Sequence, residues 1–180
     1  MLRLRPYRSG DFAVVRRWVD DRASRGPFPP DLPPLSDEAV RRRVAGEDPG
    51  AVTRLAVEVD GRVIGEAQFW NARGRLPDGV FEIGIVLWDP AERGRGHGRG
   101  AQRALLDLLF GERGAFRVQA GTAPGNVAER RCLEALGFTA EGTLRGFFGE
   151  RPDGSGDIVM YGLLRTEWEA RRTHLATIDP

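Results

Sequence analysis

A run of glycine and arginine is the segment of this sequence best suited to chemistry: Glu92-Arg93-Gly94-Arg95-Gly96-His97-Gly98-Arg99-Gly100. Glycines at alternate positions let backbone N–H groups converge on a ligand, because no Cβ atom blocks the approach. The arginines between them supply forked donors that suit phosphate oxygens. Ala101, Leu105 and Leu109 follow at helical spacing, so a helix N-terminus adds its positive dipole end. The run therefore predicts a phosphate or pyrophosphate site.

Two other interpretations of this run remain open. A glycine-rich turn can be a plain linker, and Arg-Gly repeats also occur in disordered RNA-binding segments. Neither usually stands between a buried strand and an amphipathic helix. No Gly-Lys-Ser/Thr follows, as a Walker loop would need, and the βαβ context of a dinucleotide site is missing. We expect the anion ligands to be Arg93, Gly94, Arg95, Gly96, His97, Gly98 and Arg99.

Glu82 is the candidate general base. It lies in a predicted strand, 80–88, where Phe81 and Ile83 point to one face and Glu82 to the other, with Gly84 and Val86. Gly84 is expected to leave space beside the carboxylate. The competing interpretation is a partly exposed edge carboxylate that pairs with an arginine.

The elements that must position these residues follow from periodicity and from turn and cap residues. They are a strand at 2–6, a helix over 12–19, a stiff loop at 26–34, a helix capped by Ser36, strands 53–59 and 62–70 joined by Asp60-Gly61, strand 80–88, helix 101–109, strand 116–120, a helix from Asn126 to a stop at Gly137, and a hairpin of 138–148 and 158–164 with a long turn at 153–156. This order predicts a mixed α/β sheet with helices on both faces. We expect one domain over residues 1–172 and a loose tail at 173–180.

Composition restricts the function classes. The chain has 180 residues and a net charge of +1, and all 27 of its basic residues are arginine. This charge gives no general attraction to nucleic acid or membrane. One cysteine, no long apolar run and no signal-peptide pattern predict a cytoplasmic protein. Whether it is a monomer or a homodimer stays open at this point. His97 and His174 belong to no ligand cluster, so we expect no metal.

Several segments resemble the GNAT acetyltransferase superfamily. Arg93-x-x-Gly96-x-Gly98 is similar to its Arg/Gln-x-x-Gly-x-Gly/Ala signature, and Phe81 to Ile85 to the strand before it. The stretch from Asn126 to Phe138 resembles a later helix of the family. The remaining matches resemble the branch that acetylates N-termini of ribosomal proteins: Glu141 to Arg145, Asp157 to Tyr161, and Glu167-Trp168.

This resemblance implies a single-domain, mainly antiparallel seven-stranded sheet. Strands 80–88 and 116–120 would splay, and acetyl-CoA would lie in the gap as co-substrate. Backbone groups near Val86 and Leu87 would pair with the pantetheine arm, and Asn126 would hydrogen-bond further along it.

The implied reaction is direct transfer of the acetyl group to an amine, either a protein N-terminus or a small molecule, without a covalent acyl-enzyme. Cys132 lies on an apolar helix stripe and is interpreted as buried filler. The general acid stays unassigned, because Leu133 and Glu129 stand where relatives often have tyrosine and serine. Glu129 also fits a capping box with Asn126. An inactive acyl-CoA-binding sensor and an RNA-binding module remain alternatives.

Overall fold

The computed structural model describes residues 1–21, 24, 35–47, 52–72, 79–149 and 156–178. The expected loop at 26–34 and most of the turn at 153–156 lie outside these ranges. The regular elements, in chain order, are β1 (Leu2–Arg5), η1 (Ser9–Asp11), α1 (Phe12–Asp20), α2 (Asp37–Ala45), β2 (Thr53–Val59), β3 (Arg62–Asn71), β4 (Val80–Leu87), η2 (Pro90–Glu92), α3 (His97–Leu106), η3 (Asp107–Glu112), β5 (Arg117–Thr122), α4 (Val127–Leu136), β6 (Thr139–Leu144), β7 (Ile158–Leu164) and α5 (Arg165–Ile178).

The described strands form one seven-stranded sheet in the order β1-β2-β3-β4-β5-β7-β6. The neighbours β1 and β2, β2 and β3, β5 and β7, and β6 and β7 are antiparallel. The predicted mixed α/β class with a mainly antiparallel sheet is thereby confirmed. The predicted splay of strands 80–88 and 116–120 stays a prediction.

Internal contacts divide the chain into two compact units. Unit 1 contains Met1–Trp70 and Ile83–Leu105, and unit 2 contains Asn71–Glu82 and Leu106–Pro180. The glycine–arginine run belongs to unit 1, whereas Glu82 and Asn126 belong to unit 2.

In unit 1 the turn between β2 and β3 confirms the predicted hairpin. Asp60 and Gly61 both have positive φ, 49° and 81°, as a two-residue turn that matches strand twist requires. Val59 pairs with Arg62 directly across it. The local Asp-Gly signal was therefore sufficient to set this turn.

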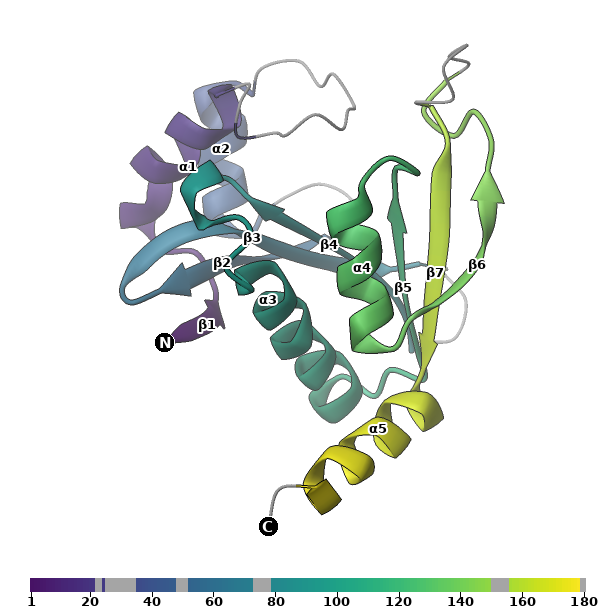
Figure 1. The fold of residues 1–180 in the computed structure, drawn as a ribbon. Helices are drawn as coiled ribbons and strands as arrows, with labels where there is room; N and C mark the ends of the chain where they lie inside the picture. The colour runs from purple at the N-terminus through teal and green to yellow at the C-terminus, as the bar shows by residue number, and fades with distance from the viewer. Residues whose placement is uncertain (22–23, 25–34, 48–51, 73–78, 150–155, 179–180) are drawn as a thin grey trace. The chain divides into compact units, whose positions relative to one another are not determined.

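Helices α1 and α2 lie side by side in unit 1 (Figure 1). Val15, Val19, Val40 and Val44 form a buried apolar cluster together with Trp88. The Oγ of Ser36 accepts a hydrogen bond from the N–H of Ala39, so Ser36 is the predicted N-cap of α2.

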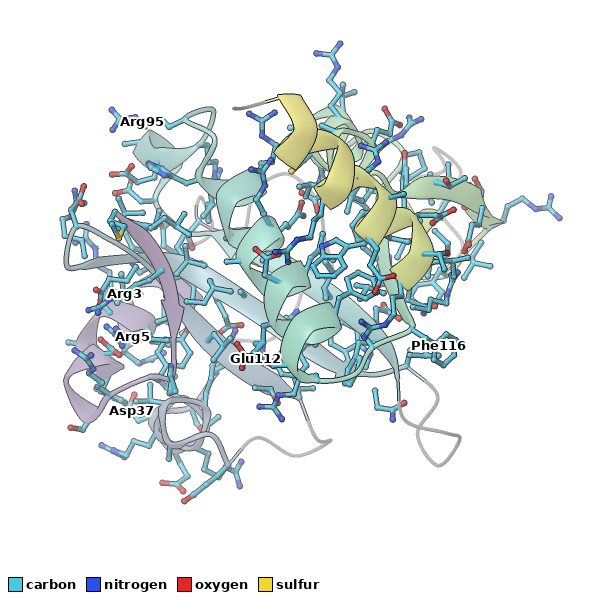
Figure 2. The ribbon with its side chains drawn as sticks, turned by 90° about the horizontal axis from the view of Figure 1, so that it is seen from below. Arg3, Arg5, Asp37, Arg95, Glu112 and Phe116 are labelled. Carbon is cyan, nitrogen blue, oxygen red and sulfur yellow. The ribbon has the colours of Figure 1, made fainter. Side chains whose placement is uncertain are left out.

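Strand β1 is fastened by its arginines (Figure 2). The Nε of Arg5 lies 2.5 Å from Glu58 Oε2 and its Nη1 lies 2.7 Å from Asp11 Oδ2. Arg3 donates to the same Glu58 carboxylate at 2.7 Å. These ion pairs link β1 to β2 and to the turn before α1.

The carboxylate of Glu66 on β3 is 2% exposed and joins several elements of unit 1. It accepts hydrogen bonds from Tyr7 at 2.8 Å, from Arg43 at 2.6 and 2.9 Å, and from Arg54 at 2.7 Å. Burial raises the pKa of Glu66, but the two arginines and the Tyr7 hydroxyl outweigh this and lower the pKa below its usual value. Burial and the neighbouring Glu66 raise the pKa of Tyr7 well above normal, so its hydroxyl remains a donor.

In unit 2 the residues of β5 alternate between the two faces of the sheet. Val118, Ala120 and Thr122 are buried, and the residues between them are partly exposed. On β7 the hydroxyl of Tyr161 accepts from Arg130 at 3.1 Å and donates to Glu134 at 3.0 Å, which fastens α4 over that strand. The other face carries Gln119, opposite Gly162 of β7.

The structure extends a helix, α5, over residues that we expected in a loose tail. Its backbone is helical to Ile178, because neither glycine nor proline occurs between Arg165 and Ile178. The ring of Trp168 stacks on Phe110 at 5.1 Å between centroids, and Arg165 donates to the Phe110 carbonyl at 2.7 Å. These contacts attach α5 to the π-helical turn η3.

Within the described residues, no helix combines the length and the apolar character needed to cross a membrane.

The Glu66 cluster generates a test of stability. Glu66→Gln leaves Arg43 and Arg54 without their buried counter-charge, so the free energy of unfolding should fall by about 3–5 kcal/mol. Since the pKa of Glu66 is lowered on folding, its stabilisation is present above the unfolded value of about 4.3 and is lost as pH falls through the folded value. Urea unfolding of both proteins from pH 7 to pH 3 should show the difference narrowing in acid.

The matched control is Glu38→Gln on the exposed side of α2, which should change stability by less than about 0.5 kcal/mol. An equally small change in Glu66→Gln would show that the cluster contributes little to stability.

Candidate functional site

In unit 1 the segment from β4 to α3 forms a turn with unpaired N–H groups at a helix start. Gly94 and Gly96 have φ of 73° and 83°, the left-handed region that favours glycine. The N–H of Gly100 donates to the Gly96 carbonyl at 2.9 Å, which closes the first turn of α3. The N–H groups of His97, Gly98 and Arg99 precede that bond and have no partner within the helix. This geometry suits an anion.

Gly98 differs from Gly94 and Gly96 because neither its backbone conformation nor a crowding atom requires a glycine there. Its φ is not in the left-handed region. An added Cβ would meet only the Leu87 side chain at 3.8 Å, an ordinary contact. The free space at Gly98 is therefore available to a ligand that approaches the backbone.

The guanidinium of Arg93 donates hydrogen bonds to backbone carbonyl groups of the protein itself. Its Nη2 donates to the Ser24 carbonyl at 2.8 Å and to the Leu87 carbonyl at 3.0 Å, and its Nε donates to Leu87 at 3.1 Å. The sequence predicted Arg93 as an anion ligand, and these bonds give its side chain a second role, which is to tie the turn to the end of β4. Periodicity gave no signal for this bond, because its acceptors are backbone carbonyls.

Glu92 is a buried carboxylate at the base of the turn, 7% exposed. Its Oε2 lies 3.3 Å from His97 Nε2 and 3.6 Å from Arg95 Nη1, and its Oε1 lies 3.6 Å from Arg62 Nη1. Arg95 itself is 64% exposed and projects outward from the turn (Figure 2). Glu92 therefore brings Arg62, Arg95 and His97 together around the turn, and Arg95 remains exposed to solvent.

Val86 and Leu87, the expected pantetheine contacts, end β4 in unit 1. Val86 is 37% exposed. A Cβ on Gly65 of β3 would lie 2.3 Å from the Val86 carbonyl oxygen, so only glycine allows the two backbones to approach this closely. The Leu87 carbonyl already accepts from Arg93. Pairing at the Leu87 carbonyl would thus compete with the bond from Arg93.

Glu82 lies at the start of β4 in unit 2 and is partly buried. Its Oε2 accepts a hydrogen bond from Gln119 Nε2 on β5 at 2.9 Å, so an amide donates here where the competing interpretation expected an arginine. The space expected beside Gly84 is filled, because a Cβ there would lie 2.8 Å from Gln68 Nε2. Sequence reasoning missed Gln119, although strand alternation could have placed it on the polar face of β5.

Asn126 is the N-cap of α4, as predicted. Its Oδ1 accepts from the N–H of Glu129 at 3.3 Å. The expected capping box also needs the Asn126 N–H to donate to the Glu129 side chain. In the structure this N–H donates to the Ala123 carbonyl at 2.9 Å. Among the described residues we find no acceptor for the Asn126 Nδ2 group, which can therefore donate to a ligand.

Two further possibilities are a reactive cysteine and a metal site. Cys132 is half-buried, so it is less enclosed than we expected. The described residues contain no group of three or more His, Cys, Asp or Glu side chains placed to hold a metal ion.

The chain is similar to known acetyltransferases. The aminoglycoside N(6')-acetyltransferase type 1 of Klebsiella pneumoniae is 31% identical over 139 residues, which are 73% of this chain and 65% of that protein. The chain thus matches slightly less than two thirds of that relative's length. The crystal structure of the aminoglycoside acetyltransferase AAC(6')-Ib with coenzyme A has a TM-score of 0.74 and 26% identity, and covers 96% of this chain and 99% of that one.

A chimera of the spermidine N-acetyltransferase SpeG from Vibrio cholerae and hSSAT is similar in fold, with a TM-score of 0.75, 22% identity and coverage of 93% and 98%. The relatives named here do not single out the ribosomal-protein branch. The model of the acetyltransferase (GNAT) domain family matches residues 1–139, more than half of the sequence. The Gly-rich turn, the strand before it and this match together establish that the chain belongs to the GNAT acetyltransferase family.

Proposed function

We propose that this protein is an acetyl-CoA-dependent N-acetyltransferase that transfers the acetyl group directly to an amine. The observation that carries the proposal is the turn before α3, in which Gly94 and Gly96 have positive φ and Gly98 is open to backbone approach. Such a turn at a helix N-terminus binds phosphate groups. Because the chain belongs to the GNAT acetyltransferase family, the pyrophosphate of acetyl-CoA is the phosphate group that we propose.

The residues present fit this co-substrate. The free N–H groups at the start of α3 and the exposed guanidinium of Arg95 would hold the pyrophosphate, since both donate to phosphate oxygens. Asn126 has an amide group available for the pantetheine arm. The backbone near Val86 and Leu87 would pair with the same arm.

The acceptor we favour is an amine on a small molecule. Its support is the relatives whose names identify them as aminoglycoside acetyltransferases. The N-terminus of a protein is a second candidate, supported by the resemblance of residues 141–145 and 157–161 to the ribosomal-protein branch.

Glu82 would act as the general base. Bound acetyl-CoA would supply the thioester carbonyl that the amine attacks, and CoA would leave as a thiolate that takes its proton from the solvent. Glu82, directly or through water, would take the proton that the amine nitrogen loses as the new C–N bond forms. An amine with a pKa of about 8 is roughly one-tenth neutral at pH 7, so a carboxylate suffices as base.

A screen of free-thiol release tests the proposal. Acetyl-CoA is mixed with the protein and with aminoglycosides, polyamines or short peptides, and the released CoA is measured. Release with at least one amine, together with the acetylated product, is the expected result. Tight CoA binding without turnover of any amine would favour a sensor, and salt-dependent RNA affinity that CoA does not affect would favour an RNA-binding module.

Glu82→Gln tests the base. With the best acceptor from the screen, kcat should fall about 10²–10⁴-fold, while KM for acetyl-CoA stays near that of the wild type. The control is Glu112→Gln, an exposed carboxylate of unit 2 (Figure 2). Wild-type turnover in Glu82→Gln would remove Glu82 from the reaction.

Gly98→Val tests the anion turn. The isolated protein should keep its melting temperature, because a Cβ at this position meets no crowding atom. The rise in melting temperature that CoA causes by binding the folded state should disappear. Gly10→Val is the control, since Gly10 also has open space around it. A full CoA-induced shift in Gly98→Val would contradict the pyrophosphate assignment.

Asn126→Asp separates the two roles of this residue. Aspartate caps a helix as well as asparagine does, so stability should not change. The loss of the Nδ2 donor should raise KM for acetyl-CoA about 3–10-fold, the value of one hydrogen bond. Asn126→Ala should lose both stability and affinity. An unchanged KM in the aspartate variant would indicate that Asn126 serves only as a cap.

A further inference from the structure

A series of hydrogen bonds crosses one face of the sheet in unit 2 and begins at Glu82. The Nε2 of Gln119 donates to Glu82 Oε2 at 2.9 Å. The Oε1 of the same carboxamide accepts from Arg117 Nε at 3.4 Å. Arg117 then donates to both oxygens of Glu141 on β6, at 2.7 and 2.5 Å. The proposed base is thus connected through two side chains of β5 to a carboxylate on the edge strand.

The backbone of β7 provides the room for this series. Gly162 stands opposite Gln119. A Cβ on Gly162 would lie 2.4 Å from Glu141 Oε1 and 2.5 Å from Arg117 Nη1. A larger residue would force the ion pair apart, so glycine at this position allows the pair to span β7.

The direction of the Gln119 carboxamide follows from its two partners. The Arg117 N–H can only donate, so it fixes the oxygen end of the amide, and the NH₂ end must face Glu82. The Arg117 guanidinium itself is held by Glu141. The hydrogen bond from Arg117 lowers the pKa of the Glu141 carboxyl group. Because the ion pair is directed away from Glu82, the residue that touches the proposed base is neutral.

A neutral donor is suited to a base. An adjacent arginine would lower the pKa of a carboxylate by about 1–3 units and so weaken it as a proton acceptor. An amide N–H holds one carboxylate oxygen in place without adding a positive charge. Within the described part of the chain the other oxygen, Oε1, has no hydrogen-bond donor, which leaves it for the amine.

We propose that Gln119 is a positioning residue that orients the Glu82 carboxylate for proton transfer, and that the Arg117–Glu141 pair fixes its carboxamide. This inference rests on the proposed role of Glu82 as general base.

Within unit 2, the side chain of Gln119 lies between Glu82, to which it donates, and Arg117, which is paired with Glu141. Glu167 also acts electrostatically on Arg117. A carboxylate introduced at position 119 would therefore place a like charge directly beside Glu82.

Two variants of Gln119 test the inference with the best acceptor amine. Gln119→Met keeps the length of the side chain and removes the donor, so kcat should fall about 10–100-fold, the range for a hydrogen bond to a charged group, with KM for acetyl-CoA unchanged. Gln119→Glu places a like charge beside Glu82. In a plot of kcat/KM against pH, the acid limb should therefore shift to higher pH by about one unit. Thr143→Val, exposed on β6, is the control and should change neither.

A double-mutant cycle distinguishes this inference from the proposed base. In a Glu82→Gln background, Gln119→Met should have almost no further effect on kcat, because its target is gone. Full activity of Glu82→Gln would overturn both proposals. A strong loss in Glu82→Gln, with additive effects of Gln119→Met and an unmoved acid limb in Gln119→Glu, would overturn the positioning role alone. Melting temperatures identify any variant whose loss comes from unfolding, and in that case the near-isosteric Gln119→Glu decides.

Discussion

Tyr7, Arg43 and Arg54 all donate hydrogen bonds to the buried carboxylate of Glu66. A buried charge costs several kcal/mol unless its partners are in place, so the segment after β1, helix α2 and strand β2 must all reach β3 together. Beside Glu66, Gly65 then lets the Val86 carbonyl approach the β3 backbone. The charge cluster thus helps to hold the strands that lead into the glycine-rich turn before α3.

The residues of the glycine-rich turn before α3 have different structural roles. Gly94 and Gly96 set the backbone path, because their positive φ is costly for other residues. Arg93 anchors the turn through carbonyl groups, and Glu92 pairs with the neighbouring Arg62 and Arg95. Arg95 stays exposed. The arginines of one short motif therefore differ in their surroundings, since Arg93 is bonded to backbone carbonyl groups and Arg95 is exposed to solvent.

Unit 2 shows a related separation of charge. The Arg117–Glu141 ion pair lies beyond the neutral Gln119, which alone of the three donates to Glu82. On the opposite face of the sheet Tyr161 fastens α4, and that helix begins at Asn126. Asn126 and Glu82 both make hydrogen bonds within unit 2, Asn126 to the backbone of Glu129 and Glu82 to the side chain of Gln119. These bonds keep the two candidate site residues in defined orientations before any ligand binds.

The sequence by itself determined the features whose signals are local. Positive φ at Asp60-Gly61 and at Gly94 and Gly96, the caps at Ser36 and Asn126, and the stop at Gly137 follow from residue types within a few positions. Tertiary structure alone decided the partners. Strand alternation gives the face of Glu82 but not that Gln119, 37 residues later, would donate to it, nor that Gln68 would fill the space at Gly84. Such pairs depend on which strands become neighbours and in what register, and a one-residue change of register would turn these side chains to the other face.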